Sequence, residues 1–167
     1  MPRPKIAFVV GHENWGKSET LRALTDRDRY QKRCLIDGVE FFIRRMSNDD
    51  KPETDSFEKF WKSIDPKKKP NVIGTLCPKF QDLDRATKLV LEVLGALRNN
   101  GYQLFFWVIR NRCKPIRNKT NEVSDGEILE LCKFVHSDKE VEVFSEIHEP
   151  AVMADKFKRF VTNVVLA

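Results

Sequence analysis

The chain has 167 residues, of which 41% are hydrophobic and 33% are charged, and its formal net charge is +5. A chain of this length buries roughly 70% of the surface that its unfolded form exposes, and its low glycine and proline content excludes collagen-like and disordered classes. We therefore expect a single folded domain over residues 1–167. The positive charge favours an anionic partner without choosing among a nucleotide, a nucleic acid and a phosphorylated metabolite.

Hydropathy and cysteine spacing exclude further classes. No apolar run approaches the ~20 residues of a membrane helix, and the first residues lead into a short strand without a signal-peptide region. We therefore expect a cytoplasmic protein that does not bind membranes. The four cysteines form no CxxC pair, the three histidines lack zinc-ligand spacing, and there is no G-x-S-x-G motif. Disulfides, zinc sites and hydrolase triads are accordingly not expected.

Apolar strands and amphipathic helices alternate along the chain. The predicted strands cover residues 5–10, 33–36, 39–46, 71–76, 102–109 and 141–147. The predicted helices cover residues 18–24, 54–64, about 82–98, 124–134 and about 150–165. Asp37-Gly38 predicts a tight hairpin turn between the second and third strands. The alternation elsewhere implies right-handed βαβ crossovers, so we predict a three-layer α/β fold whose mostly parallel central sheet has about five strands.

Residues 11–18, Gly-His-Glu-Asn-Trp-Gly-Lys-Ser, match the pattern G-x-x-x-x-G-K-[ST] between a buried strand and a helix. Gly11 and Gly16 let the backbone wrap closely around a phosphate, with successive N–H groups pointing inward. Lys17 is expected to reach the β- and γ-phosphates, and the Ser18 hydroxyl is expected to ligate Mg²⁺. Three further residues, Asn14, Trp15 and Glu19, are expected to contribute to nucleotide binding, although Trp15 could instead pack on the neighbouring loop.

The first 25 or so residues resemble the Walker A region of the P-loop NTPase superfamily. That resemblance implies a P-loop NTPase-like fold with ATP or GTP and Mg²⁺ as cofactors. P-loop enzymes usually place an acidic residue after a second core strand, whereas the strand at 71–76 is followed here by Cys77-Pro78. The nearest replacements are Asp49 and Asp50. They are candidates for a catalytic base, and Asp49 for a metal ligand, if their strand runs parallel beside the first; otherwise they belong to a polar turn.

Five basic residues follow the strand at 102–109: Arg110, Arg112, Lys114, Arg117 and Lys119. This segment resembles the basic lid of small P-loop kinases, which implies that Arg112 and Arg117 stabilise the transferring phosphoryl group. An exposed basic loop is the alternative reading. Asn111 lies where some P-loop proteins read the nucleotide base. Residues 118–121, Asn-Lys-Thr-Asn, resemble the guanine motif but lack its aspartate.

Residues 77–85 show a fainter similarity to small-metabolite kinases, with Lys79 and Arg85 at the matching positions. Three functions remain open. The first is a small phosphotransferase or NTP hydrolase acting on a small phosphorylated or nucleic-acid substrate. The second is a nucleotide-dependent switch that regulates a partner, which the missing acid after residue 76 favours. The third is a nucleic-acid-associated ATPase, which the basic clusters suggest.

Overall fold

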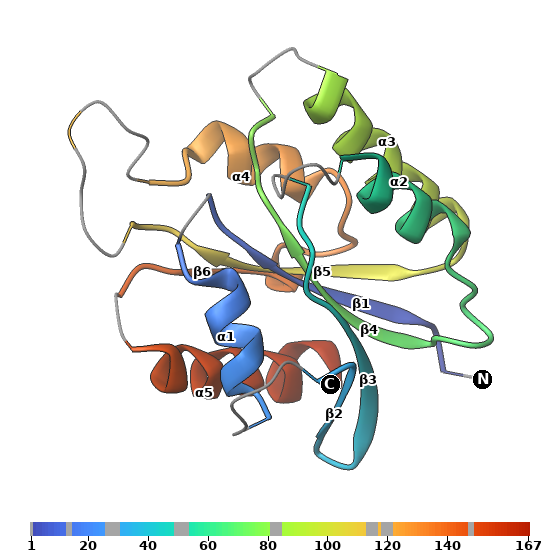
Figure 1. The fold of residues 1–167 in the computed structure, drawn as a ribbon, viewed down its shortest axis with the longest axis horizontal. Helices are drawn as coiled ribbons and strands as arrows, with labels where there is room; N and C mark the ends of the chain where they lie inside the picture. The colour runs from blue at the N-terminus through green and yellow to red at the C-terminus, as the bar shows by residue number, and fades with distance from the viewer. Residues whose placement is uncertain are drawn as a thin grey trace.

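The computed structural model describes residues 2–12, 15–25, 31–48, 54–80, 85–112, 117, 122–146 and 149–167, of which 54–56 and 85–88 are described by their backbone (Figure 1). The strands are β1 (Lys5–Val10), β2 (Arg33–Ile36), β3 (Val39–Arg44), β4 (Asn71–Leu76), β5 (Gln103–Ile109) and β6 (Val141–Phe144). The helices are α1 (Lys17–Ala23), α2 (Thr54–Ser63), α3 (Arg85–Asn99), α4 (Asp125–Cys132) and α5 (Pro150–Phe160). A 3-10 turn at Asp138–Glu140 precedes β6, and a π-helical turn at Val161–Val165 follows α5.

The strands form one sheet in the order β2-β3-β4-β1-β5-β6. β2 is antiparallel to β3, and every other neighbouring pair is parallel. The predicted α/β fold with a mostly parallel sheet is confirmed, with six strands because the short hairpin strand β2 joins the edge. Asp37, in the left-handed region with a φ of 50°, and Gly38, with a φ of 77°, make the predicted hairpin turn.

Helices cover both faces of the sheet (Figure 1). The connections β3–α2–β4, β4–α3–β5 and β5–α4–β6 all step in the same direction across the sheet. Because such crossovers are right-handed, α2, α3 and α4 lie on one face. The connection from β1 steps the opposite way, which places α1 on the other face, where it contacts α5. No helix in the described part of the chain is long and apolar enough to cross a membrane.

The core is densest around β1, whose residues Ile6 to Val10 are fully buried. The Phe8 ring stacks on Phe106 at 5.7 Å and meets Trp61 of α2 at 5.0 Å. Successive strand residues point to opposite faces, so Trp107 packs on Phe157 of α5 instead, at 5.5 Å. A near-continuous apolar strand covered on both faces is what a central parallel strand requires. This packing fixes the strand that leads into residues 11–18.

Candidate functional site

The segment 11–18 leaves the carboxyl end of β1, which lies between β4 and β5. From β1 the chain first moves toward β3 and β4, and later crosses to β5 and β6 on the other side. Open α/β sheets bind ligands outside the carboxyl ends of the strands, at such a change of direction. The Gly11 N–H donates to Leu76 O at 3.0 Å, which extends the pairing with β4 one residue into the loop.

Gly16 gives the loop its turn into α1. Its φ of 89° and ψ of 16° lie in the left-handed region, where side chains with a Cβ are strained. The Gly16 carbonyl then accepts from both the backbone N–H of Thr20, at 2.9 Å, and the Thr20 hydroxyl, at 2.8 Å. A Cβ on Gly11 would meet only ordinary contacts, the nearest being Lys17 Cγ at 3.5 Å. The backbone conformation therefore favours glycine at position 16, whereas neither conformation nor packing demands it at position 11.

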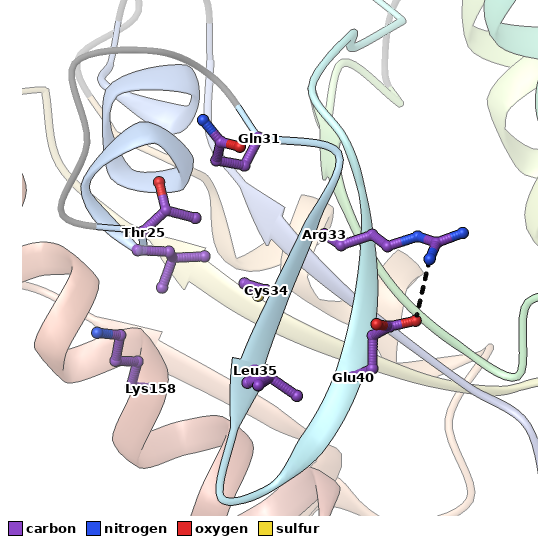
Figure 2. Close-up of a pocket in the computed structure, with 8 residues that line it drawn as sticks. Thr25, Gln31, Arg33, Cys34, Leu35, Glu40 and Lys158 are labelled. Atoms are coloured by element: carbon purple, nitrogen blue, oxygen red, sulfur yellow. Dashed lines mark ion pairs between the residues drawn. The ribbon is translucent and has the colours of Figure 1, made fainter.

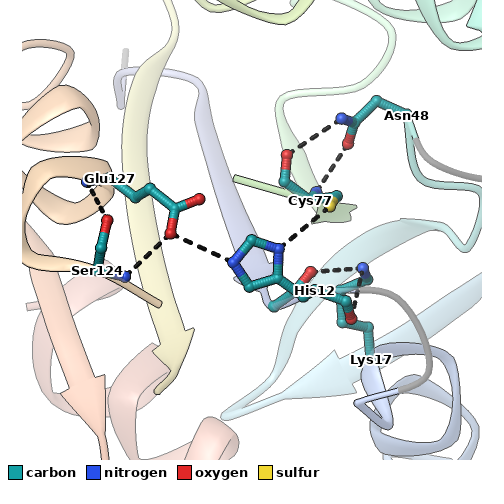
Figure 3. Close-up of polar contacts among 7 residues, drawn as sticks. His12, Lys17, Asn48, Cys77, Ser124 and Glu127 are labelled. Carbon is teal, nitrogen blue, oxygen red and sulfur yellow. Dashed lines mark hydrogen bonds and ion pairs between the residues drawn. The ribbon is translucent and has the colours of Figure 1, made fainter. Parts of the chain in front are cut away.

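Lys17 is buried, with 7% of its surface exposed, and its ammonium group lies against the loop backbone (Figure 3). Lys17 Nζ donates to Gly11 O at 2.5 Å and to His12 O at 3.3 Å. An ammonium group in an apolar setting needs such acceptors, because its desolvation is otherwise costly. The contacts hold a positive charge at the carboxyl end of the central strand.

The other predicted loop residues are placed in different ways. Ser18 is half-buried in the first turn of α1, and the Glu19 carboxylate pairs with Arg22 one turn later in the same helix. Trp15 is 5% exposed and packs edge-on against His12, with 4.9 Å between ring centroids. This ring contact lies within the loop that carries Trp15, so nucleotide binding and packing on a neighbouring loop both stay predictions. Asn14 lies outside the described residues.

His12 occupies a variable position of the motif, yet its side chain is buried at the centre of a polar network (Figure 3). His12 Nε2 lies 3.3 Å from Glu127 Oε1 of α4, and His12 Nδ1 lies 3.8 Å from Cys77 Sγ. Both ring nitrogens are satisfied when Nε2 carries the proton and Nδ1 accepts from the thiol. The loop is therefore joined through one imidazole to α4 and to the segment after β4.

Glu127 is positioned by the start of its own helix. The Ser124 backbone N–H donates to Glu127 Oε1 at 2.9 Å, while the Ser124 hydroxyl accepts from the Glu127 N–H at 3.1 Å, a complete capping box. Burial alone raises the pKa of Glu127, but the hydrogen bonds from His12 and Ser124 outweigh it, and the pKa lies below its ordinary value. The carboxylate is thus kept ionised beside the loop.

Cys77 occupies the position after β4 where P-loop enzymes usually have an acid. The Asn48 side chain forms hydrogen bonds with both backbone groups of Cys77. The Cys77 N–H donates to Asn48 Oδ1 at 2.7 Å, and the Asn48 amide donates to Cys77 O at 3.1 Å. Thr75 adds a hydrogen bond to Arg45 O at 2.8 Å. The chain after β3 is therefore fastened to the carboxyl end of β4.

Asp49 and Asp50 come directly after this fastened segment but lie outside the described residues. The sequence makes them candidates for a base or metal ligand on the condition that the strand before them runs parallel beside β1. That condition is wrong in part, because β3 is parallel but pairs with β4, and β4 separates it from β1. β3 is an outer strand because it forms the hairpin with β2, which occupies the edge.

Among the described residues of the basic segment after β5, Arg112 lies beside the loop. Arg112 Cζ lies 6.0 Å from the centre of the Trp15 ring. Arg110 instead forms an ion pair with Asp125 at 2.7 Å, and the Asn111 amide donates to Ser145 O at 2.9 Å, which joins the ends of β5 and β6. Arg117 is exposed, and the flanking residues 113–116 and 118–121 lie outside the described part.

Sequence reasoning missed His12, Glu127 and Asn48 as members of this site. Ser124-Asp-Gly-Glu127 has the S-x-x-E pattern of a capping box, which places a glutamate in the first turn of a helix. Because α4 follows β5, its first turn lies at the same sheet edge as residues 11–18. That signal was available. Asn48 and His12 carried none, since both depend on contacts between distant segments.

A concavity of about 450 Å³ lies at the carboxyl-terminal end of α1 (Figure 2). It is bounded by the end of α1, strand β2 and Lys158 of α5. Arg33 on its rim pairs with Glu40 at 3.7 Å. Burial raises the pKa of the Cys34 thiol to about 11, against a smaller opposing effect of Lys158, so Cys34 is a poor nucleophile at neutral pH. The polar network around residues 11–18 is thus the stronger candidate site.

Fold and site together define an α/β protein whose central strand leads through a glycine-containing loop and a buried lysine into a helix. No protein-family profile and no curated protein sequence matches the chain. Among solved structures it is similar to a de novo designed protein of P-loop NTPase fold, determined by solution NMR. The two share 13% identity over 97% of this chain and 93% of that chain, with a TM-score of 0.44. The description of this site therefore depends on the chain's own contacts.

Proposed function

We propose that the chain binds the triphosphate of ATP or GTP with Mg²⁺ at residues 11–18, and that it transfers or hydrolyses the terminal phosphoryl group as a small kinase-like enzyme or NTP hydrolase. One observation carries the proposal. The G-x-x-x-x-G-K-[ST] segment follows the central parallel strand, has a left-handed Gly16, and holds the Lys17 ammonium group against its own carbonyls. This combination matches what phosphate binding by a loop requires.

The proposal assigns roles to two residues of the loop and to residues that follow β5 and β3. The Lys17 charge would stabilise the β- and γ-phosphates, and the Ser18 hydroxyl would hold Mg²⁺, which neutralises charge on the phosphates when bound. Arg112 and Arg117, which follow β5 in the sequence, would supply further positive charge for phosphoryl transfer. Asp49 or Asp50 remains our candidate for the base that accepts the proton of the attacking group, because β3 runs parallel to β4 and β1 and ends on the same side of the sheet, although β4 lies between β3 and β1. The acceptor is water, a small phosphorylated molecule or a nucleic acid.

Titration calorimetry with Mg²⁺–ATP and Mg²⁺–GTP tests the binding step. Lys17→Met keeps the aliphatic stem of the side chain and removes its charge. The control, Lys68→Ala, removes an equal charge from an exposed turn that precedes β4, at the end of the sheet away from the loop. Charge-assisted hydrogen bonds contribute about 1.5–3 kcal/mol each, so Lys17→Met should weaken binding roughly 10- to 150-fold. Lys68→Ala should bind like the original chain. Equal affinities for the original chain and Lys17→Met would refute the proposal.

A nucleotide-dependent switch is the second candidate, and the end of β4 favours it. P-loop enzymes usually have an acid there, whereas the corresponding Cys77 is held by Asn48 through its backbone. Turnover separates the two functions. An enzyme transfers or releases phosphate when supplied with Mg²⁺–ATP and panels of acceptors. A switch binds nucleotide with slow release of ADP and captures a partner in only one nucleotide state, which a pull-down with ADP and with a non-hydrolysable ATP analogue measures.

A further inference from the structure

We propose that Glu127 is a positioning residue for the loop 11–18: it fixes the His12 imidazole and, through His12, the backbone that holds Lys17. The inference deepens the proposed function and depends on it, because the ligand positioned by the loop is the phosphate of a nucleotide. Glu127 does not itself contact that phosphate in this proposal. Its action passes through His12.

The geometry makes His12 the junction of three segments. Its backbone carbonyl accepts from Lys17 Nζ at 3.3 Å, so a shift of His12 displaces an acceptor of the loop lysine. Its ring reaches Glu127 Oε1 of α4 at 3.3 Å and Cys77 Sγ after β4 at 3.8 Å (Figure 3). Groups from α1, from α4 and from the segment after β4 thus fix the place of one residue of the loop.

Burial makes these contacts costly to lose. His12 is 5% exposed, Glu127 is 7% exposed and Cys77 is 1% exposed. A buried polar group whose partner is removed pays its full desolvation penalty. Conformations that withdraw His12 from Glu127 are therefore disfavoured, and His12, with the carbonyl that accepts from Lys17, is held in place before a ligand arrives.

Glu127 is suited to this task because it is itself fixed. Its Oε1 atom accepts from the Ser124 N–H as well as from His12, and its own N–H donates to the Ser124 hydroxyl. A carboxylate held by a capping box loses little side-chain freedom when it orients a neighbour. A loop fixed in its binding-competent arrangement also binds more tightly than one that visits it part of the time. We therefore expect Glu127→Ala to weaken Mg²⁺–ATP binding by about tenfold.

The test compares Glu127→Ala with two matched variants. Glu127→Gln keeps an oxygen that accepts from His12 Nε2 and Ser124 N, so its affinity should stay within about twofold of the original chain. Ser124→Ala removes the hydroxyl of the capping box and keeps the Glu127–His12 contact, which controls for a weakened α4. Calorimetry with Mg²⁺–ATP measures affinity, and thermal denaturation shows whether each variant is folded. If Glu127→Ala does not fold, His12→Asn removes the same contact from the loop side and should cause the same loss.

Histidine ¹⁵N NMR supplies a readout that affinity alone does not. The original chain should show His12 with its proton on Nε2, and Glu127→Ala should lose that fixed tautomer. Unchanged affinity in Glu127→Ala, or an equal loss in Glu127→Gln and Glu127→Ala, would overturn the inference while leaving nucleotide binding intact. If the original chain binds neither Mg²⁺–ATP nor Mg²⁺–GTP, the proposed function fails, and the positioning of a nucleotide site fails with it.

Discussion

Gly74 of β4 lies beside the Trp61 indole, and we predict that Gly74→Ala destabilises the protein. A Cβ at position 74 would lie 2.6 Å from Trp61 Cζ2, 2.8 Å from Trp61 Cη2 and 3.0 Å from Phe8 Cε1. Trp61 is 1% exposed and Phe8 is fully buried, so neither ring can move away without displacing other core side chains. The added methyl group therefore overpacks the core.

Overpacking of this kind costs about 1–3 kcal/mol. For a domain of this length, 1 kcal/mol corresponds to about 2–4 °C in Tm, so Gly74→Ala should lower Tm by roughly 2–12 °C. Gly95→Ala is the matched control, because it adds the same atoms inside α3 at a position with no atom within 4 Å. There the change should raise stability by about 0.5–1 kcal/mol, since alanine favours the helix interior.

Thermal and urea denaturation of the two variants measure both effects. Trp61→Phe removes the two indole atoms closest to the added Cβ, so the penalty of Gly74→Ala should shrink in the Trp61→Phe background. Shifts of the same sign for Gly74→Ala and Gly95→Ala would refute the reasoning. An unchanged penalty in the Trp61→Phe background would show that the clash is not with the indole.

Three further predictions concern the loop, α4 and the concavity near β2. Gly16→Ala should cost about 1–2 kcal/mol in urea denaturation, because its φ of 89° strains alanine although space is free; an unchanged stability would contradict that. The pKa of Glu127 lies below its ordinary value of 4.5, so its contribution to stability is complete above that pH and is lost as the pH falls through the lower folded value. Glu127→Gln should therefore make the free energy of unfolding less dependent on pH in this acidic range. Parallel curves of unfolding free energy against pH for the variant and the original chain would contradict this contribution of Glu127. Because burial raises the pKa of Cys34 to about 11, its alkylation measured by mass spectrometry should accelerate up to about that pH, and Lys158→Ala should slow it near neutral pH.

The strand–loop–helix unit at residues 5–24 could be predicted because its signals are local. A continuous apolar run identifies β1, and the spacing of Gly11, Gly16 and Lys17 identifies the loop that follows it. Asp37-Gly38 gave the hairpin for the same reason, since a two-residue turn depends only on its own backbone preferences. Alternation of strands and helices then gave the α/β class, because crossover chirality limits the ways in which such elements can pack.

The contacts around His12 could not be predicted, because 115 positions separate it from Glu127 in the sequence. Their meeting depends on the strand order, which places β5, and with it the start of α4, beside β1. The same limit applies to β3. A sequence pattern shows that Val39–Arg44 is a strand. Only the pairing of this strand with β4, in which Phe42 lies beside Val72, shows that β4 separates β3 from β1.

The central place of β1 in the sheet also determines when this strand can pair during synthesis. Residues 5–10 leave the ribosome before their two strand neighbours, which are residues 71–76 and 103–109. Lys5 Nζ, at the start of β1, donates to Val165 O at 2.7 Å, and α1 packs on α5. The loop is therefore translated before the strands that flank β1 on either side. A nascent chain arrested before residue 103 should lack β5, one of the two strands that flank the strand leading into the loop. Pairing between residues so far apart in the sequence makes folding slow.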